Sequence, residues 1–251
     1  MDSIVCHDDK MHQVAKLLVE NRSNEDWGEI ANYRGAECPR EIANEFLLCC
    51  LIDYRSKAKD AWNRGRHYFE RLDAEHKSEL WKKIADTSRE DWTSKENFDR
   101  CKLHWMRPAH NRLWQIAINI CAFFEGDARK IWQDGSLFDV LCRLYYIGAG
   151  DQISRMIVGA LKDCGQISSG RSDVKADVHV CRVLSRVFDG KEISPAAAVS
   201  MARKMYPADP WYLDSPLWEL GQTRCNSESP KCVGCYLQSQ CKYAQEHSLR
   251  G

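Results

Sequence analysis

The sequence has 251 residues, carries a formal net charge of zero and is 44% apolar by residue count. This length is enough for one large helical domain or two small ones, and the apolar content supports a buried core. A neutral chain is not the polycation typical of proteins that coat nucleic acid without specificity, so any nucleic-acid surface must be local. We expect an intracellular protein, because there is no long apolar run for a membrane span and no secretory h-region at the N-terminus. We also expect it to be a monomer.

Apolar residues recur at helical spacing along most of the chain, with few alternating β-branched runs. The clearest patterns predict helices over residues 42–62, 113–124, 137–144, 151–161 and 178–187, and a further helix that opens at Pro195. Glycine, serine and proline collect in residues 164–173 and 206–216, where we expect loops. The fold class predicted from these patterns is all-α.

Cysteine is abundant, with thirteen residues, but disulfides are not expected in a reducing compartment. Nine cysteines are scattered, mostly within apolar helical patterns that are typical of small buried hydrophobes: Cys6, Cys38, Cys49, Cys50, Cys101, Cys121, Cys142, Cys164 and Cys181. The other four lie within seventeen residues of one another: Cys225, Cys232, Cys235 and Cys241. This group needs a separate explanation.

The four clustered cysteines have the spacing Cys-x6-Cys-x2-Cys-x5-Cys. Thiolates are soft ligands that select zinc, copper(I) or iron–sulfur clusters. Structural zinc sites usually pair two short Cys-x2-4-Cys knuckles, whereas only Cys232 and Cys235 form such a pair here. The spacing therefore favours a loop wrapped around an iron–sulfur cluster, with zinc as the alternative.

This cysteine loop, together with Gln222-Thr223-Arg224 directly before it, resembles the C-terminal cluster loop of the endonuclease III family of helix–hairpin–helix DNA glycosylases. The resemblance implies that the four cysteines ligate a [4Fe–4S] cluster, which is structural in that family and helps place basic residues against DNA. It implies that Arg224 contacts DNA phosphates, with Lys231 and Lys242 as further candidates.

A Gly-Ala-Gly segment between two predicted helices resembles the hairpin turn of the same family, L-P-G-h-G-x-K-x-A. Gly148 and Gly150 permit a tight turn, and amides at the start of the following helix can form a phosphate-binding nest. The resemblance places Gly148, Gly150, Gln152 and Arg155 at DNA. Ile147 replaces the family proline, and an ordinary corner between helices would also explain the glycine pair.

The segment Ala-Asp-Val-His-Val-Cys-Arg-Val around Asp177 resembles the V-D-x-H-h-x-R-h segment that holds the catalytic aspartate of these glycosylases. The resemblance implies that Asp177 stabilises the positive charge that grows on the sugar as the glycosidic bond breaks, or orients the attacking water. An aspartate directly before a helix is also a common N-cap, and the two roles can coexist. We expect His179 to be a structural partner rather than a base.

One departure from the family concerns the nucleophile. Bifunctional members carry a lysine two residues after the second hairpin glycine, where this chain has Gln152. Glutamine cannot form an imine, so we predict a monofunctional glycosylase without abasic-site lyase activity. Lys162 and Lys175 are the alternative nucleophiles.

Two further segments are candidate contacts to DNA. Asp53, Tyr54 and Arg55 lie where the family has a polar pocket element, so the base pocket would use Tyr54 for stacking and the other two for hydrogen bonds. The alternative is an ordinary helix with one solvent-exposed face. Residues 100–114 are basic with interleaved aromatics, which suits backbone contact and wedge insertion, or else a solvated loop anchored by its aromatics.

These motifs together predict an all-α protein of two helical lobes that flips out and removes a damaged, mispaired or modified base from double-stranded DNA. We expect an N-terminal arm (1–37) packed on the cluster lobe, a six-helix domain with the hairpin (38–173), and the Asp177 helix with the cluster lobe (174–251), with DNA in the cleft between the lobes. The alternatives are a non-catalytic DNA-binding protein with a structural cluster, and an iron–sulfur electron carrier or redox sensor.

Overall fold

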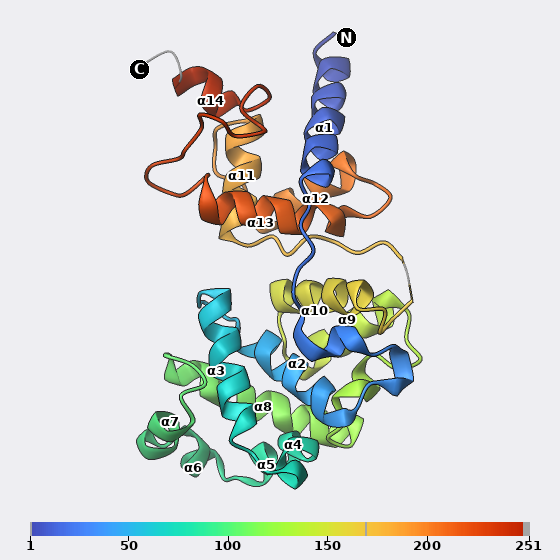
Figure 1. Ribbon diagram of the computed structural model, residues 1–251, viewed down its shortest axis with the longest axis vertical. Coiled ribbons are helices and arrows are strands. Elements are labelled where there is room, and N and C mark those ends of the chain that lie inside the picture. Colours follow the sequence, from blue (N-terminus) through green and yellow to red (C-terminus); the bar gives the residue numbers. More distant parts are fainter. Residues whose placement is uncertain (1, 169, 248–251) are drawn as a thin grey trace. The chain divides into compact units, whose positions relative to one another are not determined.

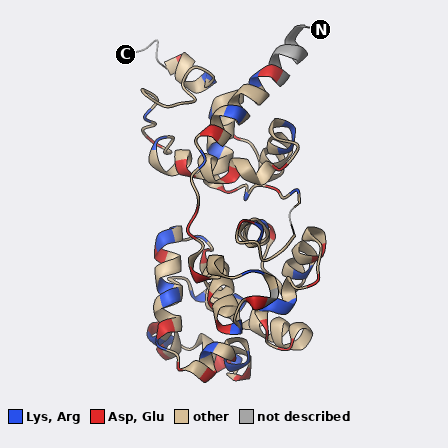
Figure 2. Cartoon of the chain, turned by 45° about the vertical axis from the view of Figure 1, so that its right-hand side comes forward, with Lys and Arg blue, Asp and Glu red and all other residues tan. Residues whose placement is uncertain are grey.

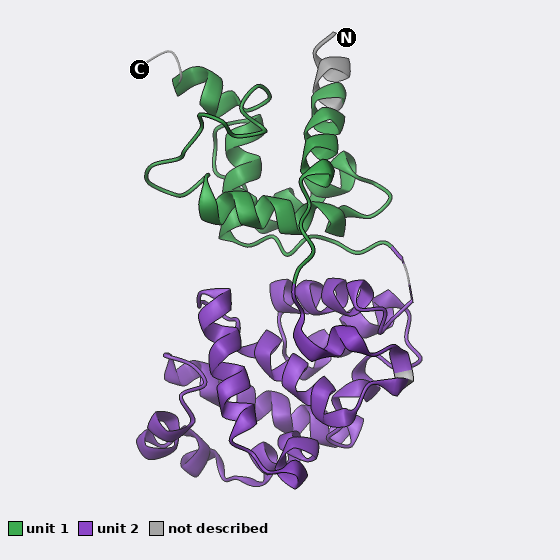
Figure 3. Cartoon of the chain, viewed as in Figure 1, with its two compact units in different colours: residues 1–25, 171–251 green, residues 26–170 purple. Residues whose placement is uncertain are grey.

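The computed structural model describes residues 2–168 and 170–247, and the regular elements in this part of the chain are all helices (Figure 1). The prediction of an all-α fold is therefore confirmed. Figure 3 shows two compact units, one formed by residues 1–25 and 171–251 (unit 1) and the other by residues 26–170 (unit 2). Among the described helices, none has the length and hydropathy needed to cross a membrane.

Unit 1 combines the first helix of the chain with its C-terminal third. Its elements are α1 (Asp2–Glu20), α11 (Val178–Phe188), α12 (Pro195–Met205), the 3-10 helix η4 (Pro210–Leu213), α13 (Asp214–Thr223) and α14 (Lys242–His247). The prediction of a loop over 206–216 is thus wrong in its second half, which contains η4 and the start of α13. Proline at the first turn of a helix loses no hydrogen bond, so the prolines there begin helices instead of excluding them.

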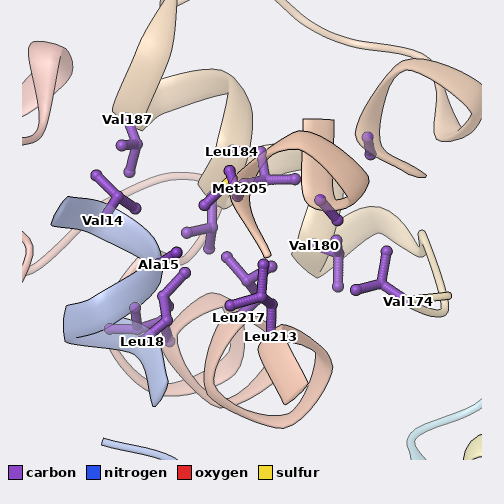
Figure 4. Packing of buried hydrophobic residues seen from close by; sticks show 14 of the residues in the cluster. Val14, Ala15, Leu18, Val174, Val180, Leu184, Val187, Met205, Leu213 and Leu217 are labelled. Atoms are coloured by element: carbon purple, nitrogen blue, oxygen red, sulfur yellow. The ribbon is translucent and has the colours of Figure 1, made fainter. Parts of the chain in front are cut away.

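The core of unit 1 is built from apolar stripes of α1, α11 and α13 (Figure 4). Val14 and Leu18 of α1 are fully buried, as are Leu184 of α11 and Leu217 of α13. Residues four apart lie on the same face of a helix, so these stripes follow from the sequence periodicity. The N-terminal helix and the C-terminal third therefore share one core.

Unit 2 is built around a central helix. Its elements are η1 (Gly28–Asn32), η2 (Gly35–Glu37), α2 (Arg40–Ile52), α3 (Ala58–Glu70), α4 (Ala74–Ser78), α5 (Leu80–Asp86), α6 (Arg89–Thr93), α7 (Lys95–Cys101), α8 (Arg107–Phe124), η3 (Ala128–Ile131), α9 (Leu137–Ile147) and α10 (Asp151–Asp163). Every residue of α2 from Phe46 to Ile52 is buried, so this helix runs through the middle of the unit.

The prediction of one helix over residues 42–62 is wrong. The structure contains two helices there, because α2 ends at Ile52 and α3 begins at Ala58. Arg55 has a positive φ of 50°, which no helix residue adopts, and the polar segment between Ile52 and Ala58 forms a turn. The apolar residues of α3 happen to continue the spacing of α2, so periodicity alone does not reveal the break.

The boundaries between the units lie at residues 25/26 and 170/171, where the sequence suggested 37/38 and 173/174. Side-chain hydrogen bonds tie the segment after residue 25 to unit 2. Gln166 Nε2 donates to the carbonyls of Ile30 and Tyr33 at 3.3 and 2.9 Å, and Arg34 Nη1 donates to Cys164 O at 2.5 Å. Hydrogen bonds from distant side chains to loop carbonyls leave no periodic signal in the sequence.

Candidate active site and nucleic-acid interface

Asp177 is the N-cap of α11 in unit 1. Its Oδ1 accepts hydrogen bonds from the amides of His179 and Val180 at 2.8 and 3.1 Å, so the carboxylate satisfies two of the amides that a helix start leaves unpaired. Among the described residues Oδ2 accepts no hydrogen bond, and the side chain is partly exposed. One oxygen therefore holds the carboxylate in place while the other is left to meet a ligand or water.

Asp214 is a second carboxyl group close to Asp177. It is the first residue of α13, only 5% of its surface is exposed, and its Oδ1 accepts from the backbone amide of Lys175 at 2.5 Å. Burial, and then the charges of Glu25 and Asp177, raise the pKa of Asp214 well above its usual value. Asp214 thus holds the backbone two residues before Asp177, and burial favours its neutral form even though the bond from the Lys175 amide favours the carboxylate.

We expect Asp214→Asn to raise the free energy of unfolding at neutral and alkaline pH more than it does at acid pH. The amide keeps an oxygen that can accept from Lys175 N but has no charge to desolvate. The pKa of Asp214 in the folded state lies above its unfolded value near 4. Below that pH the carboxyl is neutral in both states and does not destabilise the fold. As the pH rises toward the folded pKa, the carboxyl lowers the free energy of unfolding by an increasing amount. Denaturant unfolding of both proteins across a pH series measures this difference, and a gain that does not grow with pH would contradict it.

Helix α11 also carries two arginines, one turn apart, that bind the cysteine loop. Arg182 Nε donates to Cys225 O and Arg182 Nη2 to Gly221 O, both at 2.7 Å. Arg186 Nη1 donates to Asn226 O at 2.6 Å and lies 3.4 Å from Cys225 Sγ. The helix that Asp177 caps is therefore the same helix that holds the start of the cysteine loop.

Gly221 allows α13 to lie against the first turn of α11. A Cβ atom added at this glycine would lie 2.6 Å from the Cβ of His179 and 2.9 Å from its Cα. Arg182 Nη2 lies 3.0 Å from His179 Nδ1, which must accept because a guanidinium only donates. His179 is thus a packing and hydrogen-bonding partner, which is the role the sequence suggested for it.

The four clustered cysteines line one hollow in unit 1. Its other walls are mostly apolar and include Val183, Val187, Leu220 and Leu237. Within the described ranges, no three His, Cys, Asp or Glu side chains converge as a single metal ion would require. A [4Fe–4S] cluster makes a different demand, because its four thiolates bind separate iron atoms. Four thiols around one apolar hollow are a donor set that fits such a cluster.

Near this loop, the three basic side chains suggested for phosphate contact differ in accessibility. Arg224 is exposed and its Nη1 lies 3.4 Å from Val233 O, while Lys231 is exposed as well. Lys242 Nζ instead donates to the backbone carbonyl of Asp189 at 3.1 Å. The structure thus leaves Arg224 and Lys231 accessible and ties Lys242 to the end of α11.

In unit 2, the Gly-Ala-Gly segment forms a tight corner between α9 and α10. Gly148 and Gly150 have φ angles of +97° and +79°, which favour glycine strongly. Gly150 is the N-cap of α10 and has no side chain to cap the first turn, so the amide end of a thirteen-residue helix is presented at the corner. This geometry suits an anion such as a DNA phosphate.

Arg112 of α8 binds the carbonyl groups of the hairpin turn. Its Nη2 donates to Gly148 O at 3.2 Å and also to Ala149 O, and Asn119 Nδ2 donates to Ile147 O at 3.2 Å. The carbonyls of the turn are therefore bound inside the unit. The amides of Gly148 and Ala149 are bound too, to the carbonyls of Tyr145 and Leu144, so a ligand would be met by the chain from Gly150 onward. The sequence patterns did not single out Arg112 for this role.

Asp151 and Arg155, one turn apart on α10, form an ion pair beside the hairpin. Arg155 Nε lies 3.0 Å from Asp151 Oδ1, and the hydroxyl of Tyr145 donates to the same oxygen. Burial, followed by this bond to Asp151, raises the pKa of Tyr145 to about 12. The acid at the hairpin is therefore balanced by Arg155, so Arg155 is not simply an extended phosphate ligand.

The turn between α2 and α3 lies beside the loop before α8. The guanidinium of Arg112 lies 5.0 Å from the ring centre of Tyr54, and His104 Nε2 bonds to Tyr54 O at 2.6 Å. Trp105 is 64% exposed, stacks on His104 and donates from Nε1 to Arg55 O at 3.1 Å. Arg112 thus contacts both the hairpin and the Tyr54 turn, and the Trp105 loop contacts the same turn through His104 and Trp105.

Asp53 does not share the setting of its two neighbours. It is the C-cap residue of α2 and is buried, whereas Tyr54 is half-buried and Arg55 is exposed. The three residues therefore form a turn and not one face of a helix, because α2 has already ended. Of the three, Tyr54 and Arg55 are the ones accessible from outside the unit.

The scattered cysteines mostly behave as small core residues. Cys38, Cys49, Cys50, Cys101 and Cys164 are buried, and Cys121 and Cys181 are partly buried. The expectation is wrong for Cys142, which is exposed on α9. The side chain of Cys6 lies outside the described part of the chain.

Comparison with solved structures supports this fold, whereas comparison of the sequence alone finds no match. No protein-family model matches the sequence, and a search of curated proteins finds no significant relative. Among solved structures, a thermostable thymine-DNA glycosylase matches with a TM-score of 0.63 and 13% identity over 95% of this chain and 98% of its own. Endonuclease III in a trapped covalent complex with DNA matches with a TM-score of 0.60 and 14% identity over 98% of each chain.

A non-covalent complex of endonuclease III with DNA also matches, with a TM-score of 0.60 and 15% identity over 99% of this chain and 98% of that one. At these identities the likeness concerns the fold and not the chemistry. It extends over nearly the whole of each chain, although the motifs in the sequence cover mainly the second half. The chain therefore has the fold of the endonuclease III-like helix–hairpin–helix DNA glycosylases.

Proposed function

We propose that this protein is a DNA glycosylase that hydrolyses the N-glycosidic bond of a modified or mispaired base in duplex DNA. The observation that carries the proposal is the setting of Asp177 within this fold. One carboxylate oxygen is fixed by two helix amides, and the other accepts no hydrogen bond from the described residues. Fixed carboxylates aimed at developing charge are an efficient means of transition-state stabilisation.

In the proposed reaction, Asp177 faces the anomeric carbon of the flipped nucleotide. Its negative charge stabilises the positive charge that develops on the sugar as the bond to the base breaks, and Oδ2 orients or deprotonates the attacking water. The buried acid Asp214 supports this arrangement through its bond to the Lys175 amide. DNA phosphates are bound at the hairpin amides of unit 2 and at Arg224 of unit 1.

The Trp105 loop supplies a candidate for the side chain that fills the gap left by a flipped base. Trp105 is exposed, yet its indole N–H is held by Arg55 O, so the ring is pre-positioned. Inserted aromatic or apolar wedges are a common way to stabilise unstacked DNA. Trp105→Ala should weaken binding to a duplex with an abasic site by about tenfold, since a base–aromatic stack contributes roughly 1–3 kcal/mol. Trp105→Phe should retain most of the affinity; equal losses in both variants would argue against stacking.

We infer that the chain is monofunctional because Gln152 occupies the position of the lysine nucleophile. Lys162 lies in the last turn of α10, at the far end of that helix from the hairpin, and donates to Gly170 O at 3.3 Å. That leaves Lys175, two residues before Asp177, as the remaining alternative. Trapping with borohydride distinguishes the two mechanisms, because only an imine intermediate is captured.

A panel of duplexes tests the function directly. Each duplex carries one oxidised pyrimidine, alkylated purine, deaminated base or mismatch, and release of the free base is scored separately from strand cleavage. We expect base release from at least one duplex, with cleavage only after alkali. Strand cleavage with borohydride trapping would contradict the Gln152 argument. Binding without any base release would indicate a non-catalytic DNA-binding protein.

We propose that Cys225, Cys232, Cys235 and Cys241 hold a [4Fe–4S] cluster. When bound, the cluster would cross-link the loop, which Arg182 and Arg186 hold against α11. Protein purified without added metal should contain about four iron atoms per chain. Cys235→Ser should lose the iron, whereas Cys142→Ser, which changes an exposed cysteine of unit 2, should keep it. Stoichiometric zinc without iron would contradict this assignment.

A further inference from the structure

A basic hollow lies in unit 2, and of the residues that line it only Arg100 and Cys101 belong to a segment singled out in the sequence, the basic stretch 100–114. It has a volume of about 360 Å³ and is formed by the end of α3 and by α5, α6 and α7. Figure 1 shows α5, α6 and α7 at one end of this unit, away from α10 and therefore from the start of α10 at the hairpin. The volume is within the range of sites for small ligands.

Three cationic side chains from three different elements line this hollow: Arg71, Lys83 and Arg100. Within residues 2–168 and 170–247 none of the three forms an ion pair with a carboxylate. Lys and Arg are interspersed with Asp and Glu over both units (Figure 2), and the chain as a whole is neutral. The described lining of the hollow thus contains three cations and no carboxylate, although Asp73 lies close enough to Lys83 for that ammonium group to contribute to lowering the pKa of Asp73.

The charges of Arg71, Lys83 and Arg100 all act on the thiol of Cys101. Cys101 lines the hollow, and although burial raises the pKa of its thiol most strongly, Arg100, Arg71 and Lys83 all act to lower it. Arg71 is held by bonds from Nη2 to the carbonyls of Arg100 and Cys101 at 3.4 and 3.2 Å. Arg71 is thus held at the hollow by two carbonyls, and Lys83 and Arg100 line the same hollow.

A hydroxyl group adds a neutral donor to this set. Tyr68 lines the hollow and is largely buried, yet its hydroxyl has no hydrogen-bond partner in the described part of the chain. Burial raises the pKa of Tyr68, so the hydroxyl stays protonated and able to donate. The hydroxyl oxygen is not among the fully buried polar atoms that lack a partner, so it is accessible from the hollow and can donate to an oxygen-rich anion there.

We propose that this hollow binds a phosphate group through Arg71, Lys83, Arg100 and the Tyr68 hydroxyl, as a second anion site apart from the hairpin. Guanidinium groups and a hydroxyl match phosphate oxygens in charge and in hydrogen-bonding role. The phosphate belongs either to a free nucleotide or to the backbone of a DNA segment outside the glycosylase footprint. The proposal does not rest on glycosylase activity.

The test compares binding of inorganic pyrophosphate, dAMP, deoxyadenosine and unmodified duplex DNA by calorimetry. Lys83→Gln is the main variant, because the ammonium group makes no hydrogen bond within the described residues and its loss should not disturb the fold. Arg100→Gln is the second variant, and Lys95→Gln is the control, since Lys95 is exposed on the same helix and does not line the hollow.

If the phosphate is free, dAMP and pyrophosphate bind, deoxyadenosine does not, and Lys83→Gln and Arg100→Gln each weaken binding about tenfold. If it belongs to DNA, duplex binding falls in both variants, and the slope of log K against log salt falls by about 0.9 for each cation removed. Either result supports the site. Unchanged affinity for every phosphate probe in both variants, or an equal loss in Lys95→Gln, overturns it.

Discussion

Asp177→Asn is expected to lower the rate of base release in a single turnover by about 10³-fold, with little change in affinity for the same duplex. The loss of a fixed charge at the reaction centre removes transition-state stabilisation and the water-activating base, each of which contributes about 10²–10³-fold or more. Asparagine is as good an N-cap as aspartate, so the bonds to the His179 and Val180 amides and the start of α11 should persist. Rapid-quench measurement of base release, with DNA binding measured in parallel, separates the two effects.

Asp73→Asn is the matched control for this substitution. Asp73 is also an N-cap, with its side chain accepting from the amide of His76 at the start of α4. The same change there should leave base release unaltered. A rate in Asp177→Asn within threefold of the unmodified protein would contradict the catalytic role of this carboxylate.

Gly221→Ala is expected to destabilise the folded protein by about 3 kcal/mol, the upper end of the usual cost of overpacking. The added methyl group would lie 2.6 Å from the Cβ of His179 and 2.9 Å from its Cα, and backbone atoms cannot move aside as the end of a flexible side chain can. The start of α11 and α13 would have to separate, which also disturbs the bond from Arg182 to Gly221 O. Base release should fall along with stability, because the first turn of α11 positions Asp177.

Gln222→Ala is the control for Gly221→Ala. Gln222 is the next residue of α13 and is exposed, so alanine there should change the free energy of unfolding by less than about 0.5 kcal/mol. Denaturant unfolding of both variants gives the comparison. Equal stability of Gly221→Ala and the unmodified protein would show that the two helices are not in the contact described.

Much of the fold was predictable because its signals are local. The stripes of α9, α10 and α11 have the period of an amphipathic helix, and the Gly148–Gly150 corner follows from the conformations that only glycine adopts easily. The N-cap role of Asp177 is likewise a local preference that the structure bears out. The cysteine spacing predicts a ligand set without any knowledge of the surrounding fold.

The features that the sequence did not reveal depend on contacts between distant residues. Arg112 reaches the hairpin from a helix about thirty-six residues earlier, and Asp214 meets Lys175 across thirty-nine residues. Arg182 and Arg186 do have a possible signal, because they lie one turn apart on α11, but nothing local shows what they bind. The break between α2 and α3 was hidden because the apolar residues on either side keep helical spacing.

The central claim is that residue 177 acts at the sugar of a flipped nucleotide while the hairpin holds phosphate. The most direct test is a crystal structure of Asp177→Asn bound to a duplex with an abasic-site analogue. We expect the side chain of residue 177 to lie in contact with the analogue's C1′ position, with a phosphate at the amide end of α10. A complex in which residue 177 faces solvent away from the DNA, or in which the hairpin contacts no phosphate, would contradict the account.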